Sequence, residues 1–590
     1  MKSNQFIKYC TIFVVFAVCI TAEAFASMIV VTTTSDEASD SSYGSSTGAG
    51  VSLREAIMQA KNNPGNDDIF LNSGSTYTLT IAGRNENSNL TGDIDISDSS
   101  GTVTIHGKNA IVQAGTDNSN GIDRIFHVVS GTVYVNRLTL RYGYVTGSTW
   151  TETGGIIYNS GNITFKNCSF RDSTAEYAGG VFSNSSNTLN FIQCTMYNNF
   201  SNYGGAGYNS NSGQLNMTNC TISGNTIGNS YDFLYNDGTA NLINITAYKG
   251  TSSGSLYRRN GDVTLTNCLI EGFLSISTGG VISSGGYNII GYIASGTFNQ
   301  TTGDIVGTSG TPADIGINTT LTNNGGPTDT HALLSTSNGR DAGTSSGAPL
   351  RDQRGYLRSS TDMGAFEYNG VASSAPTNIN LSSNSVADDS YSNTTVGTLS
   401  VTDSDSGETY TYVLVPGTGS TDNNSFYIDG NLLKTNHVFD YETKSSYSIR
   451  LWVDDGISTY EKQMTISIID LVEELFILHP STTQNQAQPI SIPLTINNIT
   501  STGIMSIELE IGYDPNVLTA TGISLTGTVI DNHNYLYVFN TDNPGTIYAV
   551  FASSSDIYTG TGILLYLDFT VTGTAGETSD ITIVSSRFNN

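Results

Sequence analysis

Short acidic segments recur between residues 384 and 474, and carboxylates spaced in this way could supply oxygen ligands to a cation. The segment VTDSDSGETY (Val401–Tyr410) contains three acids, and similar segments begin at Asn384, Phe439 and Val453. Asp, Ser and Gly also build ordinary turns, so one segment alone predicts a turn as readily as a metal site. Calcium takes about six to eight oxygen ligands, so several of these loops would have to converge on one point.

Strand-like runs in residues 377–474 would position these acidic loops. TVGTLSVTD, YTYVLV and SYSIRLWVDD alternate apolar and polar residues, and turn-forming residues separate them. This pattern predicts a β-sandwich of about seven strands, with the acidic segments in its loops or at its strand ends. The polar stretch NGVASSAP at residues 369–376 predicts a linker before this module.

The order of the acidic segments resembles cadherin repeats in their bacterial form. TVGTLSVTDSDSG is similar to the family's Asp-x-Asp segment, FDYET to its Asp-x-Glu segment and DDG to its Asp-x-Gly segment. The resemblance implies bound calcium, which would stiffen the module by cross-linking loops that otherwise repel. The ligands that it implies are Asp388, Asp403, Asp405, Asp440, Glu442, Asp454 and Asp455. Glu408 is interpreted as an ordinary charge at a strand edge. The alternative to calcium binding by these ligands is a calcium-free sandwich with an acidic surface.

Residues 475–590 form a second strand-rich region without any long helical pattern. YDPNVL (Tyr513–Leu518), GTIYAVFAS and GTGILLYLDFTV (Gly560–Val571) resemble the cohesin domain, a jelly-roll β-sandwich. The resemblance implies docking to dockerin-bearing proteins, but it does not locate the binding face. A non-binding sandwich of similar fold is the alternative. The sequence ends at SSRFNN, near the expected last strand, which predicts an incomplete domain or a different packing.

The region before these modules is repetitive. Segments such as NITFKNCSFRDS, LNFIQCTMYNN and LNMTNCTISGN place Cys168, Cys194 and Cys220 in equivalent positions about 25 residues apart, and Cys268 follows two repeats later, with Ile245 in the position between. Two strands and two turns in each repeat, without helices, predict a right-handed parallel β-helix over residues 28–368. Each cysteine would then face inward as a small hydrophobic residue, and we expect free thiols in preference to disulfides. Asn residues at the turns would form side-chain ladders.

An amphipathic helix is predicted ahead of the first repeat, in VSLREAIMQAKNNPG. Ser52 and Glu55 have capping-box spacing, and Leu53, Ile57 and Ala60 share one helical face. Because the open end of a β-helix exposes strand edges and apolar core, we expect this helix to lie across the first coil.

Several motifs of the repetitive region resemble secreted bacterial β-helix proteins of the choice-of-anchor Q type. They are SLREAI, GGPTDTHALL, RDQRGY and DMGAFEY, which occur in this order. Proteins of that family are described as surface-associated, and the resemblance names no catalytic residue. We interpret Arg351, Asp352, Arg354, Asp362 and Glu367 as a structural polar cluster at the C-terminal cap.

Secreted β-helices also include polysaccharide lyases and hydrolases, so an enzyme is the main alternative. Glycoside hydrolysis uses paired carboxylates; Asp93 and Asp95 share a strand face, but the sequence suggests no histidine near them. The six histidines are scattered without metal-ligand spacing. Arg141 and Arg171 occupy equivalent repeat positions and would lie on adjacent coils. A β-helix that binds glycans without cleaving them is the third possibility.

The N-terminal segment and the net charge of the chain favour an exported protein. Lys2 and Lys8, the apolar run Tyr9–Ile20 and cleavage sites after Ala24 or Ala26 predict a signal peptide at residues 1–26, and a membrane anchor is the alternative. The net charge of −28 disfavours nucleic acid and anionic lipid as partners. Together these features predict an all-β, secreted surface protein that acts in calcium-dependent adhesion and assembly, with dockerin-bearing proteins or polysaccharide as partners and no membrane span after cleavage.

Overall fold

The computed structural model describes residues 27–589 with several internal gaps. The gaps are residues 38–49, 85–86, 150–151, 231–232, 250–255, 278–279, 389, 442, 470–475, 479–483, 500–505, 531–535 and 553–559. The predicted signal peptide therefore lies outside the described residues. In the part of the chain that is described, no helix is long and apolar enough to cross a membrane.

Contacts divide the chain into two units, which are described separately. The first comprises residues 1–375 with 405–407 and 455–458, and the second comprises residues 376–404, 408–454 and 459–590. Strands are the predominant secondary structure of both units, as the composition predicts. The all-β class is therefore confirmed.

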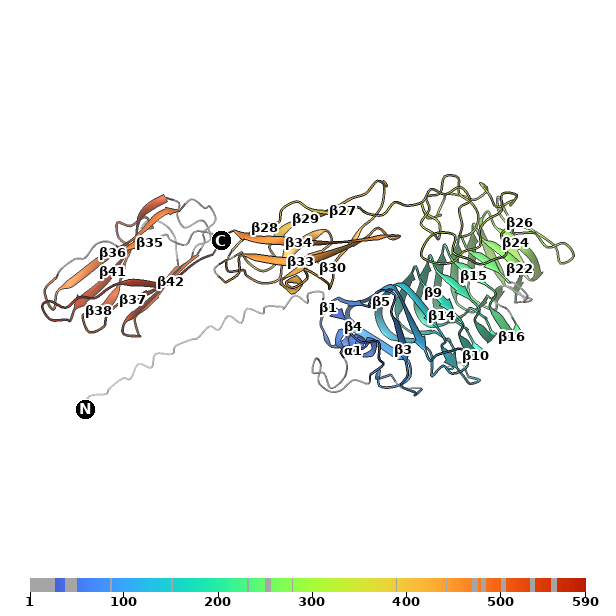
Figure 1. Ribbon diagram of the computed structural model, residues 1–590, viewed down its shortest axis with the longest axis horizontal. Helices are drawn as coiled ribbons and strands as arrows, with labels where there is room; N and C mark the ends of the chain where they lie inside the picture. Colours follow the sequence, from blue (N-terminus) through green and yellow to red (C-terminus); the bar gives the residue numbers. More distant parts are fainter. Residues whose placement is uncertain are drawn as a thin grey trace, which may run out of the picture. The chain divides into compact units, whose positions relative to one another are not determined.

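The first unit is dominated by one large parallel sheet (Figure 1). Its longest row of strands is β4 (Ile94–Ala114), β5 (Phe126–Arg141), β8 (Asn162–Lys166), β11 (Phe182–Ile192), β14 (Gly207–Thr218), β18 (Thr239–Ile243), β21 (Val263–Thr266) and β23 (Val281–Gly286). A second row is β9 (Ser169–Arg171), β12 (Thr195–Tyr197), β15 (Thr221–Ser223), β19 (Thr246–Tyr248), β22 (Leu269–Ile276) and β24 (Ile289–Ser295). The shorter strands are β1 (Ser27–Val30), β2 (Asp67–Phe70), β3 (Thr76–Leu79), β7 (Ile157–Asn159), β17 (Leu234–Asn236), β20 (Leu256–Arg258), β25 (Thr297–Asn299) and β26 (Ile305–Val306). A separate parallel sheet contains β6 (Tyr144–Val145), β10 (Thr174–Ala178), β13 (Phe200–Tyr203) and β16 (Thr226–Ser230).

Equivalent residues of successive repeats pair in register across this sheet. Phe165 pairs with Phe191, and Phe191 pairs with Met217, so apolar side chains stack on apolar side chains. All three are fully buried in the same core. This arrangement is compatible with the predicted stack of coils, because parallel strands one repeat apart are neighbours throughout.

The cysteines follow the same rule. Cys168, Cys194, Cys220 and Cys268 are free and fully buried, which confirms the prediction of free thiols. Burial raises the pKa of the Cys268 thiol to about 12, so this thiol stays protonated at physiological pH.

A ladder of buried asparagines lies beside the core, as the sequence predicts. The Nδ2 group of Asn159 donates to Oδ1 of Asn184 at 2.8 Å, Asn184 donates to Asn209 at 2.9 Å, and Asn209 donates to Asn236 at 2.8 Å. Each amide also donates to a backbone carbonyl, which belongs to its own turn for Asn159 and Asn236 and to the next repeat for Asn184 and Asn209. The ladder therefore satisfies polar groups that stacking would otherwise bury without partners.

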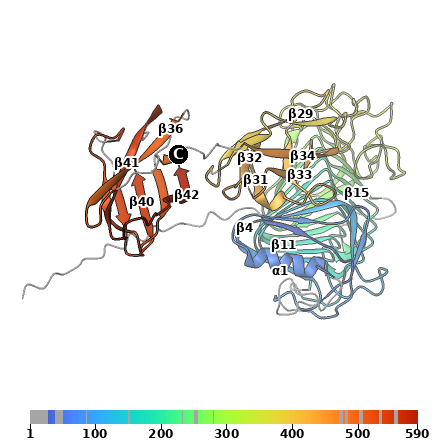
Figure 2. The same cartoon turned by 60° about the vertical axis from the view of Figure 1, so that its left-hand side comes forward.

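The single α-helix among the described residues, α1 (Leu53–Asn62), precedes the stack. Its capping box is formed as predicted, with the Ser52 side chain accepting from the Glu55 N–H and the Glu55 side chain accepting from the Ser52 N–H. Leu53 and Ile57 are buried in the main core. In Figure 2 α1 lies beside β4, and it also contacts β1 and β2, so it covers the core at the N-terminal end of the sheet.

The last part of the first unit does not form the C-terminal cap that the sequence analysis predicted. Arg351, Asp352, Arg354, Asp362 and Glu367 were expected to lie in a C-terminal cap, and they belong to residues 316–368, here called the strap. The strap lies along one side of the stack, because turn amides hold strap carbonyls at successive repeats. Gln193 donates to Asp352 O, Asn219 to Arg351 O, Asn244 to Asp362 O and Asn267 to Thr344 O.

The polar cluster of the strap is nevertheless structural, as expected. Arg354 pairs with Asp352 at 2.7 Å and Arg358 pairs with Glu367 at 3.0 Å, and all four side chains are nearly fully buried. The opposite charges therefore pair with each other inside the strap. Arg354 and Arg358 also donate hydrogen bonds to the backbone oxygens of Glu367 and Gly364, respectively.

The second unit contains four antiparallel or mixed sheets of four strands each. The first two are built from β27 (Asn378–Leu381), β29 (Thr395–Thr402), β32 (Leu432–Thr435) and β31 (Phe426–Asp429), and from β28 (Ser385–Ala387), β34 (Thr459–Ile469), β33 (Ser446–Asp454) and β30 (Thr411–Leu414). The other two are built from β35 (Phe476–Leu478), β36 (Pro489–Ile499), β41 (Gly560–Val571) and β38 (Leu518–Ser524), and from β39 (Leu536–Asn540), β40 (Thr546–Ala552), β37 (Ser506–Gly512) and β42 (Thr582–Asn589). Each pair of sheets encloses its own hydrophobic core. The terminal SSRFNN segment, where a last strand seemed cut short, contributes to β42 and pairs with β37.

The asparagine ladder gives a first test of the fold. Replacing Asn209 with Ala leaves the amide of Asn184 and the carbonyl oxygen of Asn236 without their ladder partner. We expect the first unit to lose about 1–3 kcal/mol of stability, the usual cost of a buried unsatisfied group. The matched control is Asn216→Ala, which breaks a half-buried bond to Asn190 and should cost clearly less. Calorimetric unfolding of the full chain measures both, and equal losses would contradict the role of the buried ladder.

His331 predicts a pH effect on the attachment of the strap. The ring is buried between Asn318 O and the Ser223 hydroxyl, each at 2.8 Å from a ring nitrogen, and burial lowers its pKa. The folded protein then binds fewer protons here than the unfolded chain, so this contribution is present above pH 6.5 and is lost as pH falls.

We expect the midpoint temperature of unfolding to fall more between pH 7.5 and pH 5 in the natural protein than in His331→Asn. Calorimetry of the full chain measures the difference between the two pH profiles, because other titrating groups cancel in it. Parallel profiles would show that His331 does not titrate against folding.

Candidate functional site

The structure brings two of the predicted calcium ligands together in one loop. Asp403, Asp405 and Glu408, between β29 and β30, can each offer one carboxylate oxygen so that all three oxygens lie within 4.8 Å of one another. All three residues are half-buried. The Ser374 N–H also donates to Asp405 at 2.7 Å. Three carboxylates this close repel one another, and a bound cation would relieve that repulsion.

Glu408 was wrongly set aside as an ordinary strand-edge charge. It joins Asp403 and Asp405 because the chain turns at Gly407, whose φ of +79° lies in the left-handed region that favours glycine. The signal that could have found it is the acid-x-acid-x-Gly-acid order from Asp403 to Glu408, with the glycine directly before the third acid.

The remaining predicted ligands are not members of this group. Asp440 accepts hydrogen bonds from the Thr443 N–H and hydroxyl, and Asp455 accepts from the N–H groups of Ile457 and Ser458. These carboxylates close turns in their own loops. Asp388 and Asp454 are buried, and Glu442 lies outside the described residues.

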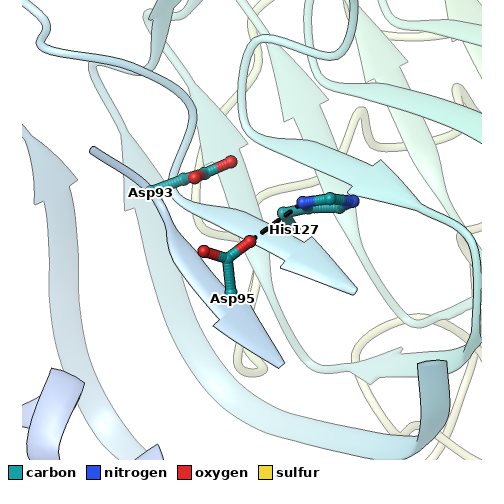
Figure 3. A group of neighbouring side chains, drawn as sticks. All are labelled: Asp93, Asp95 and His127. Carbon is teal, nitrogen blue, oxygen red and sulfur yellow. Dashed lines mark hydrogen bonds and ion pairs between the residues drawn. The ribbon is translucent and has the colours of Figure 1, made fainter. Parts of the chain in front are cut away.

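A second group of metal-ligand type lies in the first unit, at Asp93, Asp95 and His127 (Figure 3). Asp93 immediately precedes β4, Asp95 lies in β4, and strand pairing places Asp95 directly beside His127 of β5. The distance from Asp95 Oδ1 to His127 Nδ1 is 2.9 Å. The expectation that no histidine lies near this acid pair was wrong. GDIDIS and RIFHVV begin equivalent strands, so aligning these early repeats could have revealed it.

Neighbouring groups fix this cluster from within the protein. Arg124 Nη1 lies 3.0 Å from Asp93 Oδ2, and Arg54 donates to the carbonyls of Gly92 and Asp93. Burial raises the pKa of the Asp93 carboxyl, and the neighbouring Arg124 guanidinium opposes this shift. The side chains of Asp93 and Asp95 are 4% and 1% exposed, so a polymer could not reach them without rearrangement. The cluster can bind a proton or a small ion, and its visible role is to hold the first strands together.

The two arginines singled out from the repeats are neighbours, as predicted. Arg141 at the end of β5 pairs directly with Arg171 at the end of β9. The side chain of Arg171 is 24% exposed and forms an ion pair with Asp172.

An exposed apolar surface covers one sheet of residues 475–590, and the sequence did not reveal it. It comprises Leu536, Val538, Tyr548 and Val550, here called the apolar face. Leu536 and Val538 of β39 are 81% and 69% exposed, and Tyr548 and Val550 of β40 are 40% and 39% exposed. Pairing of Val538 with Val550 makes the surface continuous across the two strands. LYVF is apolar on both faces of its strand, and this departure from alternation was the available signal.

Acidic residues border the apolar face. Val550 pairs with Glu508 and Tyr548 pairs with Glu510 on β37, and the Tyr548 hydroxyl donates to Glu510 at 2.8 Å. The second sheet of this region presents a different outer face. There Asp568 accepts hydrogen bonds from the hydroxyls of Ser491 and Ser524.

Comparisons with known proteins concern this last region. The family model of the cohesin domain matches residues 479–589. Among solved structures, a non-cellulosomal cohesin from Archaeoglobus fulgidus is 27% identical, with 18% of this chain and 69% of that chain covered and a TM-score of 0.15. CaCohA2 from Clostridium acetobutylicum is 26% identical, with coverages of 17% and 67% and a TM-score of 0.15. A type I cohesin–dockerin complex from Clostridium thermocellum is 17% identical, with coverages of 20% and 82% and a TM-score of 0.17.

No curated protein matches this sequence. The comparisons therefore assign one part of the chain only: residues 479–589 carry a cohesin domain.

Proposed function

We propose that this is a secreted, modular surface protein whose cohesin domain docks dockerin-bearing proteins. The observation that carries the proposal is the cohesin match at residues 479–589, in a domain with an exposed apolar sheet face. One solved structure similar to this region is a complex of a cohesin with a dockerin. The signal-peptide pattern at residues 1–26 supports export.

The apolar face is the proposed docking surface within the cohesin domain. Contiguous apolar surface is costly to leave in water, and on monomeric proteins such patches commonly mark interaction sites. Leu536 and Val538 would supply apolar contact area. Glu508 and Glu510, which flank Val550 and Tyr548, would select a partner with basic or hydroxyl groups around an apolar centre.

The other parts would present and stiffen this docking domain. We propose that residues 28–368 form a right-handed parallel β-helix of the choice-of-anchor Q type. In-register parallel pairing, the free cysteine stack and the asparagine ladder support this proposal. We propose a non-catalytic role, because Asp93 and Asp95 are buried and are paired with Arg124 and His127 respectively. A polysaccharide lyase or hydrolase is the alternative.

We further propose that residues 377–474 form a cadherin-like module that binds calcium. The support is the cluster of Asp403, Asp405 and Glu408, whose oxygens approach within 4.8 Å. Calcium takes about six to eight oxygens, so carbonyls, water or further acids must complete the site. Calcium would join loops that otherwise repel and so stiffen the module.

If the apolar face is the docking surface, substitutions that introduce charged side chains there should weaken the binding of a dockerin. Leu536→Glu combined with Val538→Glu should raise Kd for a dockerin at least tenfold, about 1.4 kcal/mol, because two carboxylates would be buried at the interface. Isothermal calorimetry of the full chain against a panel of purified dockerin modules measures this. The control is Thr519→Glu, an exposed residue of β38 in the other sheet, which should leave Kd unchanged. No binding to any dockerin, or equal loss in the control, would contradict the docking proposal.

If calcium binds to this cluster, it should raise the midpoint temperature at which the second unit unfolds. At about 100 times Kd, calcium should stabilise the folded module by about 2.7 kcal/mol, and a chelator should remove this gain. Asp403→Asn with Asp405→Asn should abolish the effect, and Glu408→Gln should weaken it. The control is Asp429→Asn, which removes an exposed carboxylate paired with Lys434 in the same module. Calorimetry of the full chain with and without chelator decides, and an unchanged midpoint would rule out the calcium site.

A further inference from the structure

One row of outward-facing side chains on the first unit combines polar, cationic and aromatic groups. Strand pairing places Thr78 beside Gln113, Gln113 beside Arg141, Arg141 beside Arg171, and Arg171 beside Tyr197. Their inward neighbours, such as Leu140 and Phe170, are in the core. Because adjacent parallel strands lie about 4.8 Å apart, the five side chains form a regularly spaced line along the stack.

The two arginines are an unfavourable pair for a sheet surface. Like charges directly opposite each other destabilise a sheet. The structure fixes Arg141 in this position: its Nε donates to Gln113 Oε1 at 2.8 Å, and Gln113 donates in turn to the Thr78 hydroxyl at 3.0 Å. Its guanidinium also lies over the Tyr142 ring, 4.6 Å from the centroid.

The terminal nitrogens of Arg141 are available to a ligand. Among the described residues, Nη1 and Nη2 of Arg141 have no hydrogen-bond partner in the protein. Arg171 is different, because Asp172 pairs with its Nη1 and Asp329 lies near enough to interact electrostatically. The row therefore keeps one unneutralised guanidinium beside a partly neutralised one, in a chain with a net charge of −28.

The strap covers this sheet face on later repeats, and near the arginines it contributes Asp329 beside Arg171, whose side chain is still 24% exposed. Thr195, Thr221 and Thr246 occupy equivalent positions on β12, β15 and β19, and each is at most 1% exposed under strap residues. Ser169, the equivalent residue beside Arg171, is half-buried. The surface is thus accessible where the two arginines lie.

We propose that Arg141 and Arg171 bind the carboxylate groups of an acidic polysaccharide, with the buried Gln113 holding Arg141 in position. A guanidinium holds a carboxylate through two parallel hydrogen bonds, and a bound carboxylate would relieve the repulsion between the arginines. The half-buried Tyr197 ring offers an apolar face to a sugar ring, and the Thr78 hydroxyl can hydrogen-bond a sugar hydroxyl. A linear polymer can follow the row because both have short, regular repeats. This binding goes beyond the docking proposal and does not depend on it.

Affinity electrophoresis of the full chain through gels containing polygalacturonate tests the proposal. We expect retardation at low salt that weakens as salt rises, and at least a tenfold loss of affinity in Arg141→Gln with Arg171→Gln. Arg141→Lys should bind with intermediate affinity, since it keeps the charge but not the paired donors. An unchanged calorimetric midpoint for the first unit would show that the variants remain folded.

The control variant is Arg259→Gln, which changes the net charge as each single substitution does. Arg259 is already held by Asp237 through two bonds of 2.7 Å, so its removal should not affect retardation. Equal loss in this control would overturn the site, as would no retardation by polygalacturonate or equal retardation by neutral dextran. Monomeric galacturonate that binds as tightly as the polymer would overturn the assignment to a polysaccharide.

Discussion

Hydrogen bonding between parallel strands one repeat apart is the constraint on which the first unit depends. It places each residue beside its equivalent in the next repeat. Equivalent positions therefore share the same environment, and the same residue type, such as Phe, Cys or Asn, recurs there in several repeats. Phe165, Phe191 and Met217 show the result in the core, and Asn159, Asn184 and Asn209 show it beside the core. A slip of one residue would turn every such side chain to the opposite face.

The same constraint explains how the strap is held and where it stops. Asn167, Asn219, Asn244 and Asn267 occur at equivalent turns with φ between 51° and 56°, a conformation that Asn tolerates better than most residues. At the last three of these turns the amide binds a strap carbonyl. The strap therefore follows the later repeats. At the Asn167 turn the amide donates to Gly456 O instead, and Arg141 and Arg171 have partly exposed side chains. A structural device for closing the sheet thus also decides which outward side chains can meet a ligand.

What could be predicted from sequence is what local or periodic patterns determine. The α1 capping box needs only Ser52 and Glu55, and the cysteine stack needs only the repeat spacing. His127 was missed because its proximity to Asp95 depends on the register of two long strands 32 residues apart. Glu408 was missed because its position depends on the backbone direction at Gly407. The apolar face at Leu536 and Val538 depends on which sheet face stays uncovered, and a strand's own sequence does not determine that.

The central claim is that whole repeats are the structural unit of the large parallel sheet in the first unit. Deleting residues 155–179 tests it directly, because it removes one 25-residue repeat and joins Gly154 to Gly180, which restores the Gly-Gly turn. The measurement is cooperative unfolding of the first unit by calorimetry of the full chain. In-register stacking predicts that this deletion retains a cooperative transition, whereas deleting residues 155–166, about half a repeat, abolishes it. Similar behaviour of the two deletions would contradict the account.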